Sequence, residues 1–180
     1  MTLPLNRRLV GNPPSGIRRI GQLAAQLPGC IALTIGEPDF DAPIAVRQHI
    51  AESILGGETH YPPNAGYPEL RRQVAAHINA RFDSDYAPEE TVFTVGSTQA
   101  LISGLMAILN PGDEVIVPVP TFGLYKPQIE IAGGVYVPLD TEKDGFQIAA
   151  ERLNAVLTER TRAILFTSPN NPNGVVLNDA

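Results

Sequence analysis

Two asparagine amides stand side by side in the run Ser168–Gly174, where two prolines and a glycine restrict the backbone. The residues just before it, 163–167, are strand-like, so the run follows a predicted buried strand at the edge where open α/β sheets bind ligands. The Asn171 amide can donate and accept, which suits a ring hydroxyl or phenolate oxygen. Proline–asparagine turns are common, so the run alone fits a ligand loop or an ordinary turn.

A second polar loop, Gly96-Ser97-Thr98, joins a strand-like run at 91–95 to a helical run at 97–109. The start of a helix exposes N–H groups and a partial positive charge, and the hydroxyls of Ser97 and Thr98 add donors, so a phosphate could bind here. Simple N-capping by Ser97 explains the same residues. The glycine pattern is neither a dinucleotide fingerprint nor a P-loop.

A third loop places Phe122 and Tyr125 three residues apart at the predicted start of a helix. An aromatic ring at this place could stack on a flat ligand, or both rings could belong to the core. All three loops follow strands of one predicted sheet. Together they offer a phosphate cradle, a ring stacker and a donor to a ring oxygen, which is stronger support for a site than any one loop.

Strands alternate with helices through the second part of the chain, which favours right-handed crossovers and a largely parallel sheet. The predicted strands are 91–95, 114–117, 135–137 and 162–167, and the predicted helices between them are 97–109, 122–132 and 148–157. Before them, the pattern predicts helices over 16–27, over 42–55 and from Pro68 onward, with a short strand at 31–35.

Composition excludes several function classes. A net charge of −6 without a Lys/Arg cluster argues against a nucleic-acid partner. No apolar stretch is long enough to cross a membrane, no signal peptide is recognisable, and the single Cys30 suits a reducing compartment, so a cytoplasmic location is expected. His49, His60 and His77 lack metal-ligand spacing, so no metal is expected.

The chain resembles the N-terminal half of the class I/II aminotransferases, which are fold-type I pyridoxal-phosphate enzymes. The matching stretches are 33–40, 61–71, 94–101, 110–117 and 168–174. The resemblance implies an α/β, aspartate aminotransferase-like fold with a mostly parallel sheet and helices on both faces, here truncated. It also implies an N-terminal arm and part of a small domain over 1–42, and an incomplete large cofactor-binding domain over 43–180. Asn173 stands where the family usually has threonine.

Six residues match the family's cofactor contacts, five of them in the three loops and the sixth being Tyr61. The resemblance implies that Gly96, Ser97 and Thr98 bind the phosphate of pyridoxal 5′-phosphate. It implies that Phe122 stacks on the pyridine ring and that Asn171 donates to the ring oxygen O3′.

Other matched positions concern the substrate and a partner subunit. The resemblance implies that the backbone of Gly36 approaches the substrate carboxylate, and that Tyr61 reaches the phosphate held by a neighbouring subunit in a homodimer. Ile17, Ile35 and Tyr67 are candidates for the substrate pocket or for the core. The segment 61–67 is similar to the aromatic and N-acetyl-diaminopimelate aminotransferase branch.

The family's reactive lysine has no counterpart here, because Lys126 and Lys143 match neither its position nor its surroundings. No catalytic residue is therefore expected in the chain, and the 180 residues alone are expected to be inactive. The leading prediction is an aminotransferase acting on an amino acid and a 2-oxo acid. A carbon–sulfur β-lyase or related decarboxylase of the same fold, or a degenerate non-enzymatic fragment, remains open.

Overall fold

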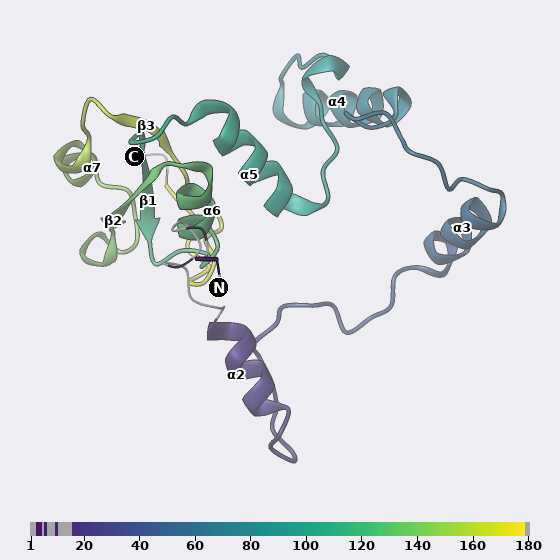
Figure 1. The fold of residues 1–180 in the computed structure, drawn as a ribbon, viewed down its shortest axis with the longest axis horizontal. Coiled ribbons are helices and arrows are strands. Elements are labelled where there is room, and N and C mark those ends of the chain that lie inside the picture. Colours follow the sequence, from purple (N-terminus) through teal and green to yellow (C-terminus); the bar gives the residue numbers. More distant parts are fainter. Residues whose placement is uncertain (1–2, 5, 7–9, 11–15, 179–180) are drawn as a thin grey trace. The chain divides into compact units, whose positions relative to one another are not determined.

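The computed structural model describes residues 16–178 together with residues 3–4, 6 and 10. The chain divides into two compact units. One comprises residues 16–95, and the other comprises residues 96–178 together with the described residues near the N-terminus. Figure 1 shows the helices and strands of both units. None of the helices in the described part of the chain has the length and apolar composition needed to cross a membrane.

The unit over 16–95 is helical. Its elements are α2 (Gly16–Ala24), α3 (Ile44–Leu55), α4 (Pro68–Phe82) and the 3-10 helix η1 (Pro88–Glu90). Helices α2, α3 and α4 confirm the predictions, and Pro68 opens α4 at a position where its missing N–H has no partner to lose. Neither α2 nor α3 has a buried residue, and their apolar side chains Ile20 and Ile50 are 49% and 55% exposed.

Contacts inside this unit fix α4 to the segment that follows it. The Nε of Arg71 donates to the carbonyls of Pro88 and Thr91, at 2.9 and 2.8 Å. Gly66 has a φ of +94°, and a Cβ there would lie 2.7 Å from Cδ2 of Phe93. Only glycine therefore allows the backbone before α4 to pass under the Phe93 ring.

Two of the strand predictions are wrong. Neither 31–35 nor 91–95 forms a strand, because no other segment of the described chain pairs with them. The N–H of Phe93 donates instead to the carbonyl of Ala65, at 3.1 Å, and Val95 is 88% exposed. An apolar, β-branched sequence favours a strand only where a neighbouring strand takes up its N–H and C=O groups.

The unit over 96–178 is built as helices and parallel strands. Its elements are α5 (Gly96–Ile108), β1 (Glu114–Val119), α6 (Tyr125–Ala132), β2 (Val135–Asp140), η2 (Glu142–Asp144), α7 (Ala150–Val156) and β3 (Thr161–Ile164). The strands pair in the order β2-β1-β3, all parallel, with Glu114 level with Val135 and Thr161. The last three predicted strands and the parallel sheet are thus confirmed, while α6 begins at Tyr125 rather than at Phe122.

Strand β1 is buried on both faces. Val115, Ile116 and Val117 have no exposed surface. Val115 and Val117 project to the side of α5 and α6, and Ile116 projects to the other side, since side chains alternate along a strand. Figure 1 shows α6 and α7 on either side of β1 and β2, as expected for a parallel sheet with helices on both faces.

A single apolar cluster fastens the two helices to this sheet. It consists of Leu105, Leu109, Val115, Val117, Tyr125 and Ile129. The turn between α6 and β2 passes very close to it, because a Cβ at Gly134 would lie 2.8 Å from Cδ1 of Leu109. This packing fixes the start of α6, which carries the aromatic loop, against α5, which carries the polar loop at its first turn.

Candidate cofactor site

The first turn of α5 has the properties of an anion site. Gly96 opens the helix with a φ of +74°, a conformation that glycine adopts at no steric cost. Ser97 and Thr98 are exposed within the first turn. The helix begins at Gly96, so Ser97 lies inside the first turn, and its role as a cap or as a phosphate donor stays a prediction. The exposed hydroxyls and the positive end of the helix dipole suit a phosphate.

Helix α6 is tied to this turn by a buried amide. The Nε2 of Gln128 donates to the carbonyl of Thr98, at 3.1 Å. Gln128 is 6% exposed, and its Oε1 is buried with no hydrogen-bond partner among the described residues. A buried polar side chain that satisfies only one end is costly, and the bond to Thr98 offsets part of that cost. That contact sets the first turn of α5 against α6.

The aromatic loop packs at the edge of the core. The rings of Phe122 and Tyr125 meet edge to face, with centroids 5.5 Å apart and planes at 76°. Tyr125 is 5% exposed and belongs to the core cluster. Phe122 is only partly buried and packs on the edge of that cluster. The core therefore holds the Phe122 ring while leaving part of it open to a ligand.

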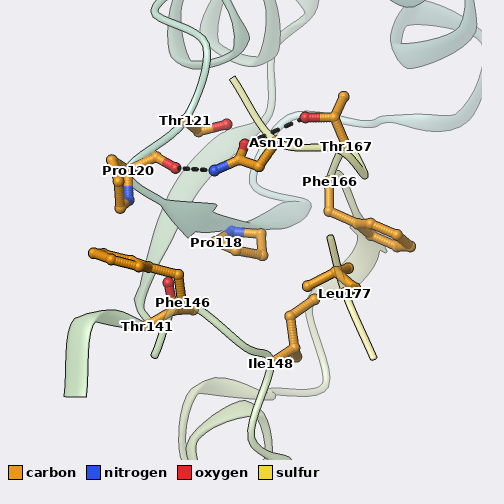
Figure 2. A pocket seen from close by; sticks show the side chains of 10 residues that line it. All are labelled: Pro118, Pro120, Thr121, Thr141, Phe146, Ile148, Phe166, Thr167, Asn170 and Leu177. Carbon is orange, nitrogen blue, oxygen red and sulfur yellow. Dashed lines mark hydrogen bonds between the residues drawn. The ribbon is translucent and has the colours of Figure 1, made fainter. Parts of the chain in front are cut away.

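The run Ser168–Gly174 folds into a tight turn that Asn170 closes. The N–H of Asn170 donates to the carbonyl of Val175, and the N–H of Gly174 donates to the carbonyl of Asn170, both at 2.8 Å. The side-chain Nδ2 of Asn170 donates to the carbonyl of Pro120 and to Oδ1 of Asn173, both at 2.9 Å. Figure 2 shows the bond to Pro120, which joins this turn to the chain leaving β1.

The two adjacent asparagines of the run therefore have different structural roles. The side chain of Asn170 forms hydrogen bonds within the fold. Asn171 is exposed at the turn, and its amide makes no hydrogen bond with the described residues. Asn173, which stands where threonine is usual, accepts from the N–H of Val175 through Oδ1, at 3.2 Å. The turn survives this change because Oδ1 still supplies an oxygen acceptor for that N–H.

A shallow cleft lies beside these loops, on the side of β1 where Pro118 projects. Figure 2 shows its lining, which is mostly apolar: Pro118, Pro120, Thr121, Thr141, Phe146, Ile148, Phe166, Thr167, Asn170 and Leu177. Thr121 and Asn170 are direct neighbours of Phe122 and Asn171, but none of the five predicted cofactor contacts in the three loops lines the cleft. An apolar cleft does not suit a phosphate. The candidate site therefore consists of the polar and aromatic residues of the three loops rather than of this cleft.

The remaining predicted residues lie in the other unit. Gly36 is exposed outside any helix or strand, Tyr61 is fully exposed, and Ile17, Ile35 and Tyr67 are about half exposed or more. They are not part of the geometry described above, and their roles stay predictions, as does the domain boundary at residue 43.

Neither lysine has a reactive environment. Lys126 lies on α6 with its side chain about half exposed, and its Nζ pairs with Oε1 of Glu130 at 2.6 Å, one helical turn away. Lys143 is exposed in η2. A lysine that attacks a carbonyl needs a desolvated amine, whereas Lys126 is ion-paired on a half-exposed side chain and Lys143 is exposed.

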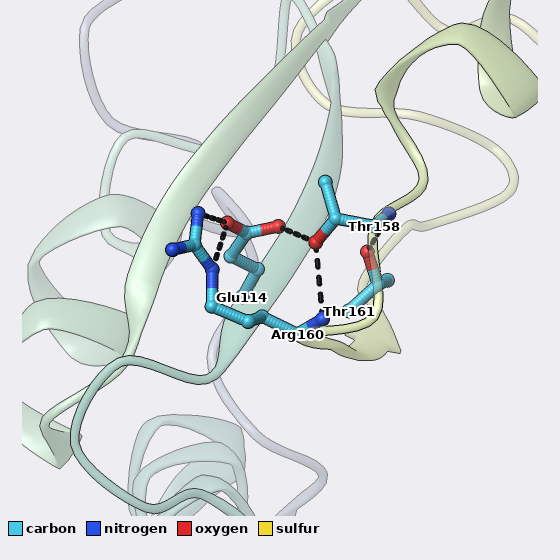
Figure 3. A network of polar contacts seen from close by, with 4 residues as sticks. All are labelled: Glu114, Thr158, Arg160 and Thr161. Carbon is cyan, nitrogen blue, oxygen red and sulfur yellow. Dashed lines mark hydrogen bonds and ion pairs between the residues drawn. The ribbon is translucent and has the colours of Figure 1, made fainter.

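The opposite ends of β1 and β3 carry a charged network instead. Figure 3 shows that Oε1 of Glu114 accepts from Nε and Nη2 of Arg160, at 2.9 and 2.6 Å. Oε2 accepts from Oγ1 of Thr158, at 2.6 Å. The Thr158 hydroxyl, followed by Arg160, holds the pKa of Glu114 below its ordinary value, although burial opposes this. The network fastens the start of β1 to the start of β3.

Two contacts that hold these loops were not predicted from the sequence. Gln128 comes three residues after Tyr125 and just before Ile129, so helical spacing puts a polar residue on an apolar side. That signal could have identified it. Asn170 carried no such signal, because its neighbour Asn171 has the same chemistry and only the fold distinguishes them.

The loops fit a phosphorylated pyridine ring. Hydroxyls at a helix start suit the phosphate, a partly open aromatic suits the ring, and an unused amide suits the ring oxygen. All three lie in one compact unit. They are connected through the Gln128–Thr98 contact, through α6, and through the Asn170–Pro120 contact. The fold is therefore of the α/β class, with three polar or aromatic loops in the unit that holds its parallel sheet.

Comparison with known proteins gives the family. The pattern "Aminotransferase class I and II" matches residues 28–180. This protein therefore belongs to the class I and II aminotransferase family, and the resemblance noted from its motifs is confirmed.

The relatives agree with this assignment and differ in specificity. The chain is 41% identical over 177 residues to the aspartate/prephenate aminotransferase of Thermus thermophilus, covering 96% of the chain and 46% of that protein. It is 38% identical over 177 residues to aromatic-amino-acid aminotransferase 2 of Thermococcus litoralis, covering 97% of the chain and 46% of that protein. The chain thus spans somewhat less than half the length of the curated relatives that it matches.

Solved structures confirm the fold. The aspartate aminotransferase of Thermus thermophilus with maleate superposes with a TM-score of 0.91 at 39% identity, covering 99% of this chain and 48% of that one. The predicted aspartate aminotransferase-like fold, present as about half of the longer proteins, is therefore confirmed.

Proposed function

We propose that this chain supplies the cofactor-binding loops of a pyridoxal 5′-phosphate-dependent aminotransferase, an enzyme that moves an amino group between an amino acid and a 2-oxo acid. One observation carries the proposal. Three loops with complementary chemistry lie in one unit, and buried or clamped amides connect them. Family membership supports the same conclusion.

Each loop has one task. The first turn of α5 binds the phosphate through Ser97, Thr98 and the backbone after Gly96, and the helix dipole favours its negative charge. Phe122 stacks on the pyridine ring from the side of the core. The Asn171 amide donates to O3′ and holds the orientation of the ring. When bound, pyridoxal phosphate supplies the electron sink for chemistry at the substrate Cα.

The proposal extends to residues of the other unit and to partners. Gly36 approaches the substrate carboxylate, and Tyr61 reaches the phosphate of a second subunit, which makes the enzyme a homodimer. A cytoplasmic location and a part in amino-acid metabolism complete it. Relatives named for aspartate, prephenate and aromatic amino acids are similarly close, so the specificity is left at the level of an amino acid and a 2-oxo acid.

The test uses protein expressed from the complete gene. We expect it to bind pyridoxal phosphate with a visible absorption band, and a stoichiometric amino acid to convert the bound cofactor to pyridoxamine phosphate. Release of ammonia and pyruvate without that conversion would instead favour the carbon–sulfur lyase. Absence of cofactor binding would leave only the non-enzymatic alternative.

A further inference from the structure

The chain leaving β1 is held from both sides. From the β2 side, the Oγ1 of Thr141, a residue 2% exposed, donates to the carbonyl of Val119 at 2.8 Å. From the β3 side, the Nδ2 of Asn170 donates to the next carbonyl, that of Pro120, at 2.9 Å. Two consecutive carbonyls are therefore fixed just before Phe122. Side-chain bonds to the backbone in a loop determine where that loop lies.

Asn170 is the residue that couples the two ring-binding loops. Its amide reaches a carbonyl two residues before Phe122, and its own backbone continues directly into Asn171. Its Oδ1 also accepts from the Thr167 hydroxyl at 3.3 Å, at the end of the β3 segment. A shift of this amide would move the proposed ring stacker and the proposed O3′ donor relative to each other.

We propose that Asn170 is a positioning residue for the cofactor ring, which sets the distance between Phe122 and Asn171. The inference rests on the proposed function and adds a residue that does not itself touch the cofactor. A ring held between a stacking side chain and an amide tolerates little displacement of either, because hydrogen bonds weaken steeply with distance and angle.

The decisive variant is Asn170→Asp. It keeps the size of the side chain and an oxygen that accepts from Thr167, but it turns the donor toward Pro120 into a carboxylate oxygen facing a carbonyl. The matched control is Gln147→Glu. Gln147 donates through Nε2 to the carbonyl of Val176 at 3.2 Å, so it loses the same kind of bond a few residues beyond the turn.

The readout is a double-mutant cycle on the affinity for pyridoxal phosphate, measured with protein from the complete gene. We expect Asn170→Asp and Asn171→Ala each to weaken binding about tenfold. The double variant is expected to bind no more than about twofold more weakly than Asn171→Ala, because Asn170 acts through Asn171. Gln147→Glu is expected to stay within about twofold of the unchanged protein.

Three results would overturn the inference. Binding by Asn170→Asp within twofold of the unchanged protein would show that the clamp has no effect on the ring. Losses that multiply to about a hundredfold in the double variant would show that Asn170 and Asn171 act independently. No binding by the unchanged protein would overturn the proposed function together with the inference. If Asn170→Asp loses its native circular dichroism, Asn170→Ala replaces it in the same cycle.

Discussion

The two ends of the three-stranded sheet use different chemistry. At the amino ends of β1 and β3, Glu114, Arg160 and Thr158 form a charged network that the fold satisfies internally. At the carboxyl ends, neutral amides hold the loops, while hydroxyls and one amide are left exposed. Strong internal pairing removes groups from ligand binding. The amino end therefore stabilises the sheet, while the carboxyl end leaves polar groups exposed.

The largest expected difference between the two ends comes from a negative charge in the first turn of α5, where the phosphate is proposed to bind. Ser97→Asp should weaken binding of pyridoxal phosphate about 100-fold, because the carboxylate repels the phosphate at close range. The same change should stabilise the fold slightly, by about 0.3–1 kcal/mol, since an acidic residue in the first turn favours the helix dipole.

Cofactor titration and urea unfolding of the same Ser97→Asp preparation give the two values. Weaker cofactor binding together with a higher free energy of unfolding would support a ligand site at this end. Unchanged cofactor affinity would contradict it.

A smaller effect is expected at the buried amide behind that turn. Gln128→Met removes the bond to the carbonyl of Thr98 but keeps the volume of the side chain. We expect cofactor affinity to fall about fivefold. Stability should change by less than about 1 kcal/mol, because the unpartnered Oε1 is removed at the same time. Equal affinities of Gln128→Met and the unchanged protein, measured by equilibrium dialysis, would show that Gln128 serves packing alone.

At the amino end, the expected effect is confined to stability. Thr158→Val removes the hydroxyl that donates to Oε2 of Glu114, and should lower the free energy of unfolding by about 1 kcal/mol. Cofactor affinity should not change, since the network lies at the other end of the strands. Urea unfolding followed by circular dichroism measures the first quantity. A matching loss of cofactor affinity would break the division between the two ends.

The smallest expected effect is a dependence on acid. The pKa of Glu114 is lower in the fold than in the unfolded chain, where it is about 4.3. Its contribution to stability is therefore fully present above that value and is lost as the pH falls through the lowered pKa. The gap in unfolding free energy between the unchanged protein and Glu114→Gln should shrink below about pH 4. A gap that stays constant down to pH 3 would contradict this assignment.

Much of the architecture followed from local pattern. The helical periodicity, the position of Pro68 and the runs that became β1, β2 and β3 predicted most elements within a few residues. The runs at 31–35 and 91–95 failed because strand formation depends on a neighbour, which local composition cannot specify. The start of α6 shifted to Tyr125, since the core takes up that ring and leaves Phe122 outside the helix.

The sequence by itself determined the chemistry at the carboxyl end: hydroxyls after a glycine, an aromatic loop and an asparagine pair, in a pattern that identifies the family. Only the tertiary structure decided which of these side chains form hydrogen bonds within the fold and which stay exposed. Asn170 and Asn171 are identical in type and adjacent in sequence, yet one bonds to Pro120 and the other is exposed. The same holds for Gln128, whose partner lies 30 residues away. Contacts between distant segments arise from packing, and packing separates residues that sequence alone treats as equal.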